Sequence, residues 1–380
     1  MKTLLAGRST NPGANEYAGV VLSSDAEIRQ LRDVARRLMQ NDDAMLDPEF
    51  FLASVSKGWA PRVVAVYSSH EVVGIMYAKE RILSGIPTGI VYADGSLGNV
   101  LLANPLHQEN AFRVAVETLS VSPGIRGMWL RVLQCSGEFD ALKQLVASRS
   151  LDAQYSPIEY GNSPLWKYHA HLPLTKTYGQ FLEGLGSTTR HNFRYYRRRF
   201  EASGHRFIAR LSMEELRSVA LDLFPKSKFT AQRQPMNIQS DLNMVAAASQ
   251  PLAIGLRHRG GEWLSVIGGW YRPGGAVLCF QCNNEGDFGP NSLSVVLRAY
   301  LIELLILQGR EELVIWGDTG PPLSRYVSYV PTIGVRLDVP TYWWRAARLF
   351  ISRVGPRLPR RLAAAAQWIS CGIFATVANY

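Results

Sequence analysis

Apolar runs separated by turn residues are densest in the second half of the chain, between residues 253 and 316. Short apolar runs bounded by turns predict three successive strands. A longer apolar stretch has the length of a buried helix. The expected order is strands at 253–258, 263–271 and 276–282, a loop containing Gly286 and Gly289-Pro290, a helix at 292–308 and a strand at 313–316.

The first half of the chain repeats this order. Its expected elements are helices at 25–40 and from Asp47-Pro48, strands at 62–67, 72–81 and 89–93, a helix at 108–120, a strand at 128–133 and a helix at 139–148. The hairpins that start at Pro61 and Pro251 have similar sequences, which indicates an internal duplication.

Chain length also favours two domains, because 380 residues exceed the size at which one hydrophobic core usually stops growing. The sequence predicts an α/β (α+β) fold with a mixed sheet in each of two tandem domains, at 1–160 and 161–340. Residues 341–380 follow as a basic amphipathic tail. The first half lacks a convincing phosphate loop after its third strand, so the second half is the better candidate for cofactor binding.

An arginine-rich helix is expected between residue 187 and Ser203-Gly204, with Gly204 at its C-terminal cap. At about 100° per residue, its aromatic side chains Phe193, Tyr196 and Phe200 share one packing face. The adjacent arc carries Arg190, Arg194, Arg197 and Arg198. This arc predicts either a solvated face with intramolecular partners or a substrate-binding platform for an acidic substrate, an anionic lipid surface or the phosphates of coenzyme A.

The element order from residue 178 to 329 resembles the acyl-CoA half of the GNAT N-acyltransferases. The stretch 188–194, TTRHNFR, is similar to the CelD-like branch of exopolysaccharide biosynthesis. Two such domains in tandem also resemble the Fem-type peptidoglycan aminoacyl transferases, more in architecture than in motif.

This resemblance implies acetyl-CoA or another acyl-CoA as co-substrate, and no metal. The residues that it places at the cofactor are Gln281, Cys282, Asn283, Gly289, Pro290, Asn291, Ser292 and Leu293. The phosphate loop departs from the family pattern, since only the middle glycine of the motif remains within 286–291. Asp287 also adds a negative charge beside the expected phosphates.

In this family an amine attacks a thioester directly, and a carboxylate or a water chain removes the amine proton. Glu285 and Asp318 follow two strands whose ends should converge, so both are candidate bases. Asp318 could equally cap a turn in Gly317–Gly320. Tyr326, or Tyr329, is the candidate general acid for the leaving thiolate.

Other site chemistries are weaker. Cys279 and Cys282 lie within one expected strand, where positions i and i+3 point to opposite faces, so a zinc or redox pair is not expected. His169 and His171 share a strand face without a third metal ligand nearby.

The net charge of +10 comes mainly from two arginine-rich segments. Five arginines lie within residues 190–199, and six lie in the tail, in both cases without an acid. The tail is expected either to contact an anionic membrane surface or to dock on the protein itself. Nucleic acid is not an expected partner, because aromatic residues do not interleave with the basic positions.

Four cysteines and no apolar stretch within residues 1–13 favour a cytoplasmic protein, peripheral on the inner face of the membrane. The leading hypothesis is an acyl-CoA-dependent N-acyltransferase acting on an amine of a sugar, a glycan precursor or a small metabolite. The alternatives are an aminoacyl-tRNA-dependent Fem-like transferase and a non-catalytic, membrane-associated binding protein. The oligomeric state is not predicted.

Overall fold

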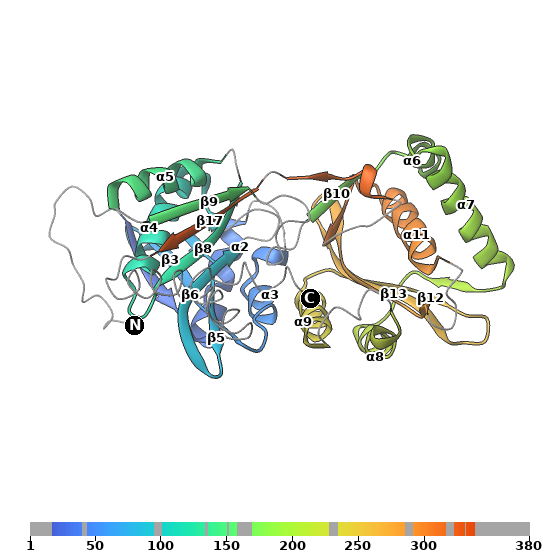
Figure 1. Cartoon of the computed structure of the whole chain (residues 1–380), viewed down its shortest axis with the longest axis horizontal. Coiled ribbons are helices and arrows are strands. Elements are labelled where there is room, and N and C mark those ends of the chain that lie inside the picture. The colour runs from blue at the N-terminus through green and yellow to red at the C-terminus, as the bar shows by residue number, and fades with distance from the viewer. Residues whose placement is uncertain are drawn as a thin grey trace, which may run out of the picture. The chain divides into compact units, whose positions relative to one another are not determined.

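The computed structural model describes residues 17–39, 44–94, 101–133, 136–149, 152–157, 169–227, 235–285, 292–316, 323–330 and 332–338. These residues form two compact units (Figure 1). Unit 1 comprises the described residues of 17–38, 58–157 and 332–338, and unit 2 comprises those of 39–57 and 169–330.

Unit 1 contains a four-stranded and a six-stranded sheet. The first has the order β1 (Tyr17–Leu22), β3 (Val63–Ser68), β4 (Glu71–Met76), β7 (Leu101–Ala103). The second has the order β2 (Trp59–Pro61), β5 (Lys79–Leu83), β6 (Ile86–Asp94), β8 (Gly127–Leu133), β17 (Thr332–Asp338), β9 (Asp152–Pro157). Only Tyr77 and Ala78 separate β4 from β5, so one long expected strand contributes to both sheets.

The helices of unit 1 are α1 (Asp25–Arg29), α2 (Arg32–Leu38), α4 (Gln108–Val121) and α5 (Gly137–Arg149), with a 3-10 turn η3 (Pro105–His107). Ser24 and Glu27 form a reciprocal capping box at the start of α1. The expected single helix at 25–40 is thus two helices, α1 and α2. Apolar residues of α4 and α5 pack on β6 and β8 to form the core of unit 1.

Unit 2 is built on one mixed sheet. Its order is β11 (Arg206–Ile208), β12 (Pro251–Arg257), β13 (Trp263–Arg272), β14 (Gly275–Asn283), β15 (Glu312–Trp316), β10 (His169–Pro173), β16 (Ser328–Tyr329). The helices are α3 (Pro48–Ala53), α6 (Tyr178–Gly184), α7 (Ser187–Ala202), α8 (Met213–Leu223), α9 (Pro235–Ala247) and α11 (Leu293–Leu307), with 3-10 turns η1 (Ala44–Leu46), η4 (Phe224–Lys226) and η7 (Leu323–Arg325).

These helices cover the two faces of the unit 2 sheet separately. The α6, α7 and α11 helices pack on one face, and α8 and α9 on the other, with α3 against α9 (Figure 1). Phe193 and Phe200 of α7 are buried in the core under α11, which confirms the packing face predicted for this helix.

Equivalent elements recur at a nearly constant spacing in the two units. The β3 strand begins at residue 63 and β12 at 251, 188 positions later; β6 and β14 begin at 86 and 275, 189 positions apart. The α4 and α11 helices begin at 108 and 293, 185 positions apart. In each unit the helix connects two parallel strands, β6 to β8 and β14 to β15. The tandem duplication expected from the sequence is therefore present in the fold.

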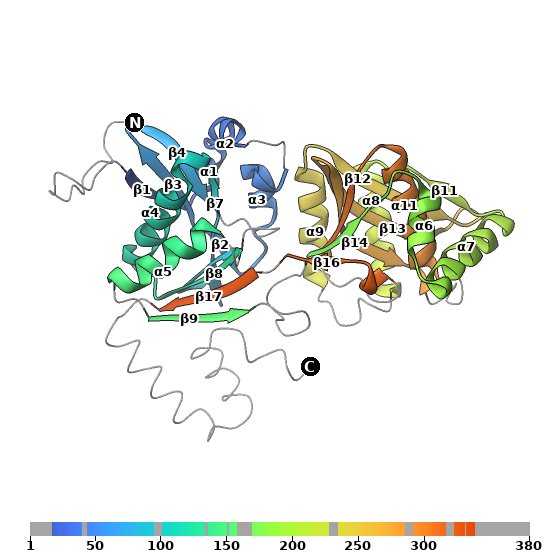
Figure 2. The ribbon, with the colours of Figure 1, turned by 90° about the horizontal axis from the view of Figure 1, so that it is seen from above.

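One strand departs from the chain order. The β17 strand follows unit 2 in the sequence but lies between β8 and β9 in unit 1, antiparallel to both (Figure 2). Similarly, β10 lies between β15 and β16 in unit 2. The domain ranges 1–160 and 161–340 remain predictions, and the tail at 341–380 lies outside the described residues.

Candidate functional site

Within the described residues, the parallel strands β14 and β15 of unit 2 pair over the first part of β14. Their pairing runs from Gly275 opposite Glu312 to Leu278 opposite Ile315, and β14 then continues to Asn283. Residues 279–283 are the part of β14 beyond this described pairing, and we call them the diverging segment. In unit 1 the equivalent strands stay paired through Asp94, the last residue of β6.

A β-bulge sets the direction of the side chains in the diverging segment. Gly269 pairs with Leu278 and Gly268 with Phe280, so β14 carries one extra residue there. One extra residue reverses the side-chain alternation of a strand. Leu278 faces the core under α11 before the bulge, and Gln281 faces α11 after it. At Gly269 any Cβ would overlap the carbonyl oxygen of Val277, so the bulge needs glycine.

The bulge brings five polar side chains into one hydrogen-bonded chain beside α11. Ser265 Oγ donates to Asn283 Oδ1 at 2.5 Å, and Gln281 Nε2 donates to the same oxygen at 3.2 Å. Arg298 Nε of α11 donates to Gln281 Oε1 at 3.0 Å. Asn283 Nδ2 donates to Glu285 Oε1 at 3.3 Å. These contacts connect the candidate base Glu285 to the first turns of α11, and we call the five residues the polar chain.

Predicted cofactor residues lie at both ends of this arrangement. Gln281, Cys282 and Asn283 belong to the diverging segment, and Ser292 and Leu293 lie at the start of α11. Ser292 is left-handed, at φ 44° and ψ 49°, and its side chain makes no capping hydrogen bond to the helix. Helix N-termini attract anions through their amide groups and dipole. The remaining predicted residues Gly289, Pro290, Asn291 and Asp318 lie outside the described residues.

The amide oxygen of Asn284 is a further polar group next to the diverging segment. Asn284 follows β14 directly, and its main-chain amide donates to the carbonyl of Leu264 at 2.8 Å. Its side chain is buried, and among the described residues none donates a hydrogen bond to Oδ1. Buried amide oxygens are normally satisfied, so this atom is suited to accept a hydrogen bond from a ligand.

Arg197 has internal partners. Its guanidinium lies 2.7 Å from Glu303 of α11 and 3.0 Å from Glu201, and 4.3 Å from the ring centre of Tyr300. Burial lowers the pKa of Arg197, but the hydrogen bonds to both glutamates outweigh burial and raise it. Burial and the Glu201 carboxylate raise the pKa of Tyr300. This geometry assigns Arg197 a structural role, joining α7 to α11.

The other arginines of the predicted substrate-binding set differ from Arg197 in their surroundings. Arg194 and Arg198 are exposed, and Arg190 is half-buried in the first turn of the helix. With the residues that the structure describes, none of these three forms an ion pair. They remain available for an anionic partner, and their role in substrate binding remains a prediction.

Tyr326 lies far along the sheet from the diverging segment. Ser328 of β16 pairs with His171, which pairs with Val314, so Tyr326 lies towards the N-terminal end of β15. Its hydroxyl accepts a hydrogen bond of 2.6 Å from the amide of Gly186, just before α7. The structure therefore does not bring Tyr326 to Glu285, and gives it the role of satisfying an amide at the start of α7.

Two members of the polar chain were not anticipated from the sequence. Arg298 is one of only two charged residues in α11, the other being Glu303, and a lone arginine in an otherwise apolar helix is a signal that could have been used. Ser265 gives no such signal, because it becomes adjacent to Asn283 only through strand pairing.

Metal chemistry finds no support within the described ranges, where no group of three or more His, Cys, Asp or Glu residues is placed to hold an ion. Cys279 and Cys282 are both buried. His171 Nδ1 lies 2.7 Å from Glu312 Oε1.

In the described part of the chain, no helix is long and apolar enough to span a membrane.

Comparison with known proteins places the fold. No family model matches the chain, and no curated protein matches it in sequence. Among solved structures it is similar to FemX, with a TM-score of 0.58 at 10% identity over 83% of this chain and 96% of that chain. The parallel pairs, connecting helices and tandem repeat agree with this similarity. The chain has a tandem GNAT-like fold.

Two further solved structures are similar to this chain in fold. A conserved protein of unknown function from Bacteroides thetaiotaomicron gives a TM-score of 0.54 at 10% identity, over 84% of this chain and all (100%) of that chain. The C-terminal domain of a protein named as a lysylphosphatidylglycerol synthetase, from Agrobacterium fabrum, gives 0.51 at 13% identity, over 87% and 97%. At these identities the similarity concerns the fold alone.

Proposed function

We propose that this protein is an N-acyltransferase that moves an acyl group from an activated carrier to an amine. The observation that carries the proposal is the polar chain of unit 2, which joins Glu285 at the end of β14 to Arg298 in α11. A carrier lying along the diverging segment would meet polar backbone on one side and the helix amides at its phosphates. The orphan amide oxygen of Asn284 adds an acceptor at the same end of the strand.

The reaction requires little covalent chemistry from the protein. The amine nitrogen attacks the acyl carbonyl carbon, the carbon–sulfur bond of a thioester breaks, and the thiolate leaves with that electron pair. Glu285 takes the proton that the amine loses, directly or through a water molecule. The hydrogen bond from Asn283 orients the Glu285 carboxylate, and the rest of the polar chain holds Asn283 in place. Asp318 is the second candidate base.

Acetyl-CoA or another acyl-CoA is the first candidate donor. Ser292 and Leu293 start the helix that would face the pyrophosphate, with Gly289, Pro290 and Asn291 preceding them in the chain. Arg298 lies in the second turn of α11, where its positive charge suits a phosphorylated ligand. Its hydrogen bond to Gln281 ties that charge to the diverging segment.

An aminoacyl-tRNA is the second candidate donor. Two likenesses support this donor. The fold is similar to that of FemX, and the sequence resembles the Fem-type aminoacyl transferases in architecture. The exposed Arg194 and Arg198, which lack ion-pair partners in the described part of the chain, would contact RNA phosphates. Binding of RNA with a steep dependence on salt would support this donor over an acyl-CoA.

The acceptor that we propose is an amine on a sugar, a glycan precursor or a small metabolite. Its support is the resemblance of residues 188–194 to the CelD-like branch, which also suggests polysaccharide biosynthesis. A glycan precursor linked to lipid would place the enzyme at the inner face of the membrane. If Glu285→Gln left all function intact, the non-catalytic binding protein would replace the enzyme.

Ser294, in the first turn of α11, offers a test of the donor site. The negative charge of an aspartate interacts favourably with the dipole at a helix N-terminus. Ser294→Asp should therefore keep or raise the unfolding temperature. The same charge opposes a pyrophosphate and should weaken acetyl-CoA binding about tenfold or more in calorimetry. Ser294→Asn, similar in size but neutral, is the matched control. If neither acetyl-CoA nor longer acyl-CoAs bind the wild-type protein, the CoA donor is excluded.

A further inference from the structure

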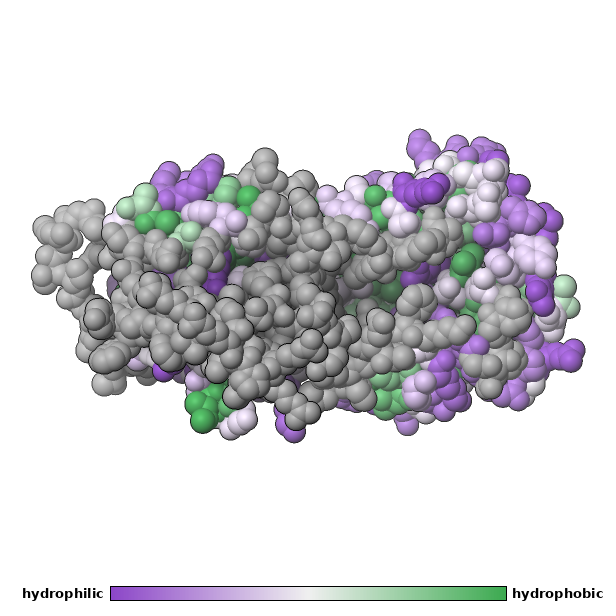
Figure 3. Space-filling view, in the orientation of Figure 1, coloured by the Kyte–Doolittle hydropathy of each residue, from purple (hydrophilic) through white to green (hydrophobic). Residues whose placement is uncertain are grey.

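An apolar hairpin tip projects from unit 1, away from its core. The β5 and β6 strands are joined by Ser84 and Gly85, at φ 49° and 82°. Next to this turn Leu83 pairs with Ile86, and these side chains are 38% and 69% exposed. The tip appears as a green projection at the lower edge of unit 1 in Figure 3. Two adjacent large apolar side chains are thus presented to solvent at a protruding turn.

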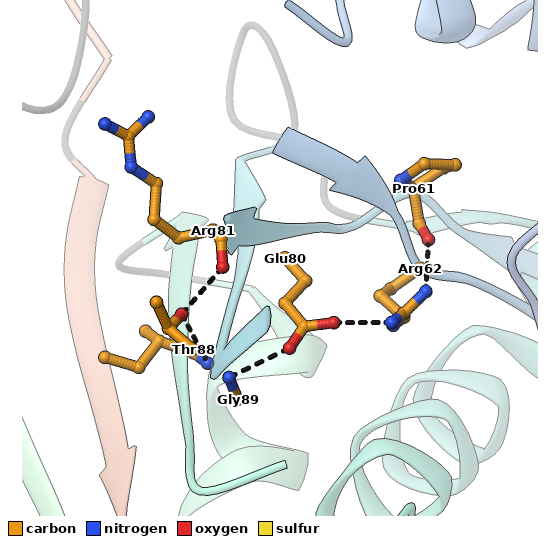
Figure 4. Close-up of polar contacts among 7 residues, drawn as sticks. Pro61, Arg62, Glu80, Arg81, Thr88 and Gly89 are labelled. Atoms are coloured by element: carbon orange, nitrogen blue, oxygen red, sulfur yellow. Dashed lines mark hydrogen bonds and ion pairs between the residues drawn. The ribbon is translucent and has the colours of Figure 1, made fainter. Parts of the chain in front are cut away.

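The base of this hairpin is rigid. Glu80 is almost fully buried, where its Oε1 accepts the amide hydrogen of Gly89 at 2.8 Å and its Oε2 pairs with Arg62 at 2.6 Å (Figure 4). Thr88 Oγ1 donates to the carbonyl of Arg81 at 2.8 Å across the same two strands. A charge-assisted buried clamp holds the backbone firmly, so the tip keeps its exposed conformation without a partner.

Positive charge surrounds the base of the tip. Arg81 lies over the ring of Trp59 at 4.9 Å, and Arg126 joins the base through its amide, which donates to the carbonyl of Gly89 at 2.7 Å. The segments that make up this region are 58–62, 79–92 and 122–127, and their only acid is Glu80, which Arg62 already neutralises. The exposed surface behind the apolar tip is therefore cationic.

We propose that this hairpin inserts its tip into an anionic lipid bilayer. Leu83 and Ile86 enter the boundary between headgroups and acyl chains, while Arg81 and Arg126 stay at the level of the lipid phosphates. A bilayer accepts so small a protrusion, whereas a stable protein interface needs roughly 1,200 Å² or more of buried surface. Charge complementarity selects an anionic membrane over a neutral one.

This inference does not depend on the acyl donor or on catalysis. It adds a described docking element in unit 1 to the membrane contact expected for the tail at 341–380. The two contacts can be separated, because substitutions at the hairpin leave the tail unchanged.

The test is co-sedimentation of the full chain with vesicles of phosphatidylcholine, with and without phosphatidylglycerol. The double variant Leu83→Ser, Ile86→Ser should bind the anionic vesicles about tenfold or more weakly, because it removes the inserted apolar surface. Arg126→Gln should reduce the preference for phosphatidylglycerol. Leu307→Ser, at an 80% exposed leucine of α11, is the matched control and should bind like the wild type.

Both hairpin side chains are solvent-exposed, so the double variant should keep the wild-type circular dichroism spectrum. Unchanged vesicle binding in that variant would overturn the proposal, as would equal losses in the Leu307→Ser control. Absence of binding by the wild type would overturn it too. If the wild type sediments as a dimer and the double variant as a monomer, the tip belongs to a protein interface instead.

Discussion

Replacing Gly269 by alanine tests the bulge that turns the diverging segment towards α11. The added Cβ would overlap the carbonyl oxygen of Val277, and would lie 3.0 Å from its carbonyl carbon and 3.3 Å from the amide nitrogen of Cys279. These are backbone atoms, so the strands must separate. Loss of about two ladder hydrogen bonds, whose buried groups stay unsatisfied, predicts destabilisation by roughly 2–4 kcal/mol.

Urea unfolding followed by tryptophan fluorescence measures this loss, since Trp270 is buried beside the bulge. Gly184→Ala is the control, because Gly184 ends α6 and a Cβ there meets nothing within 4 Å. That change should be neutral or stabilising by up to about 1 kcal/mol. A Gly269→Ala protein within about 0.5 kcal/mol of the wild type would refute the reasoning, since ordinary surface substitutions cost as little.

Two further predictions concern Glu285 and Glu312. Glu285→Gln should lower kcat about 100-fold with little change in KM, measured with the amine acceptor and the acyl donor. An unchanged kcat would exclude Glu285 as the base. The hydrogen bond from His171 holds the pKa of Glu312 below its usual value. Its stabilising contribution is therefore present above the ordinary carboxyl pKa and is lost as pH falls through the lowered one. The stability difference between wild type and Glu312→Gln should shrink as the pH falls from the ordinary carboxyl pKa through the lowered one, and a constant difference would contradict this.

Elements that depend on neighbours in the sequence were predictable. The apolar runs of β12, β13 and β14 and the glycines between them identify the hairpins, because apolar runs and turn chemistry are local properties. The packing face of α7 likewise follows from the spacing of Phe193 and Phe200. The duplicated order of strands and helices then gave the fold class.

Side-chain partners across the sheet were not predictable in this way. Gln281 and Asn283 face α11 only because one extra residue enters β14, and a single sequence does not reveal the register of two strands. The ion pair of Arg197 with Glu303 was not predictable in detail, because Glu303 lies in a different helix, far along the chain. The position of Tyr326 towards the N-terminal end of β15 likewise follows from strand pairing, which a single sequence does not reveal.

The sequence by itself determined the order, type and duplication of the elements, and it pointed to unit 2 as the candidate site. Only the tertiary structure decided which polar groups join Glu285 and where β17 inserts. The physical reason is that local periodicity depends on residues a few positions apart. Strand register and long-range pairing depend on the packing of the whole unit.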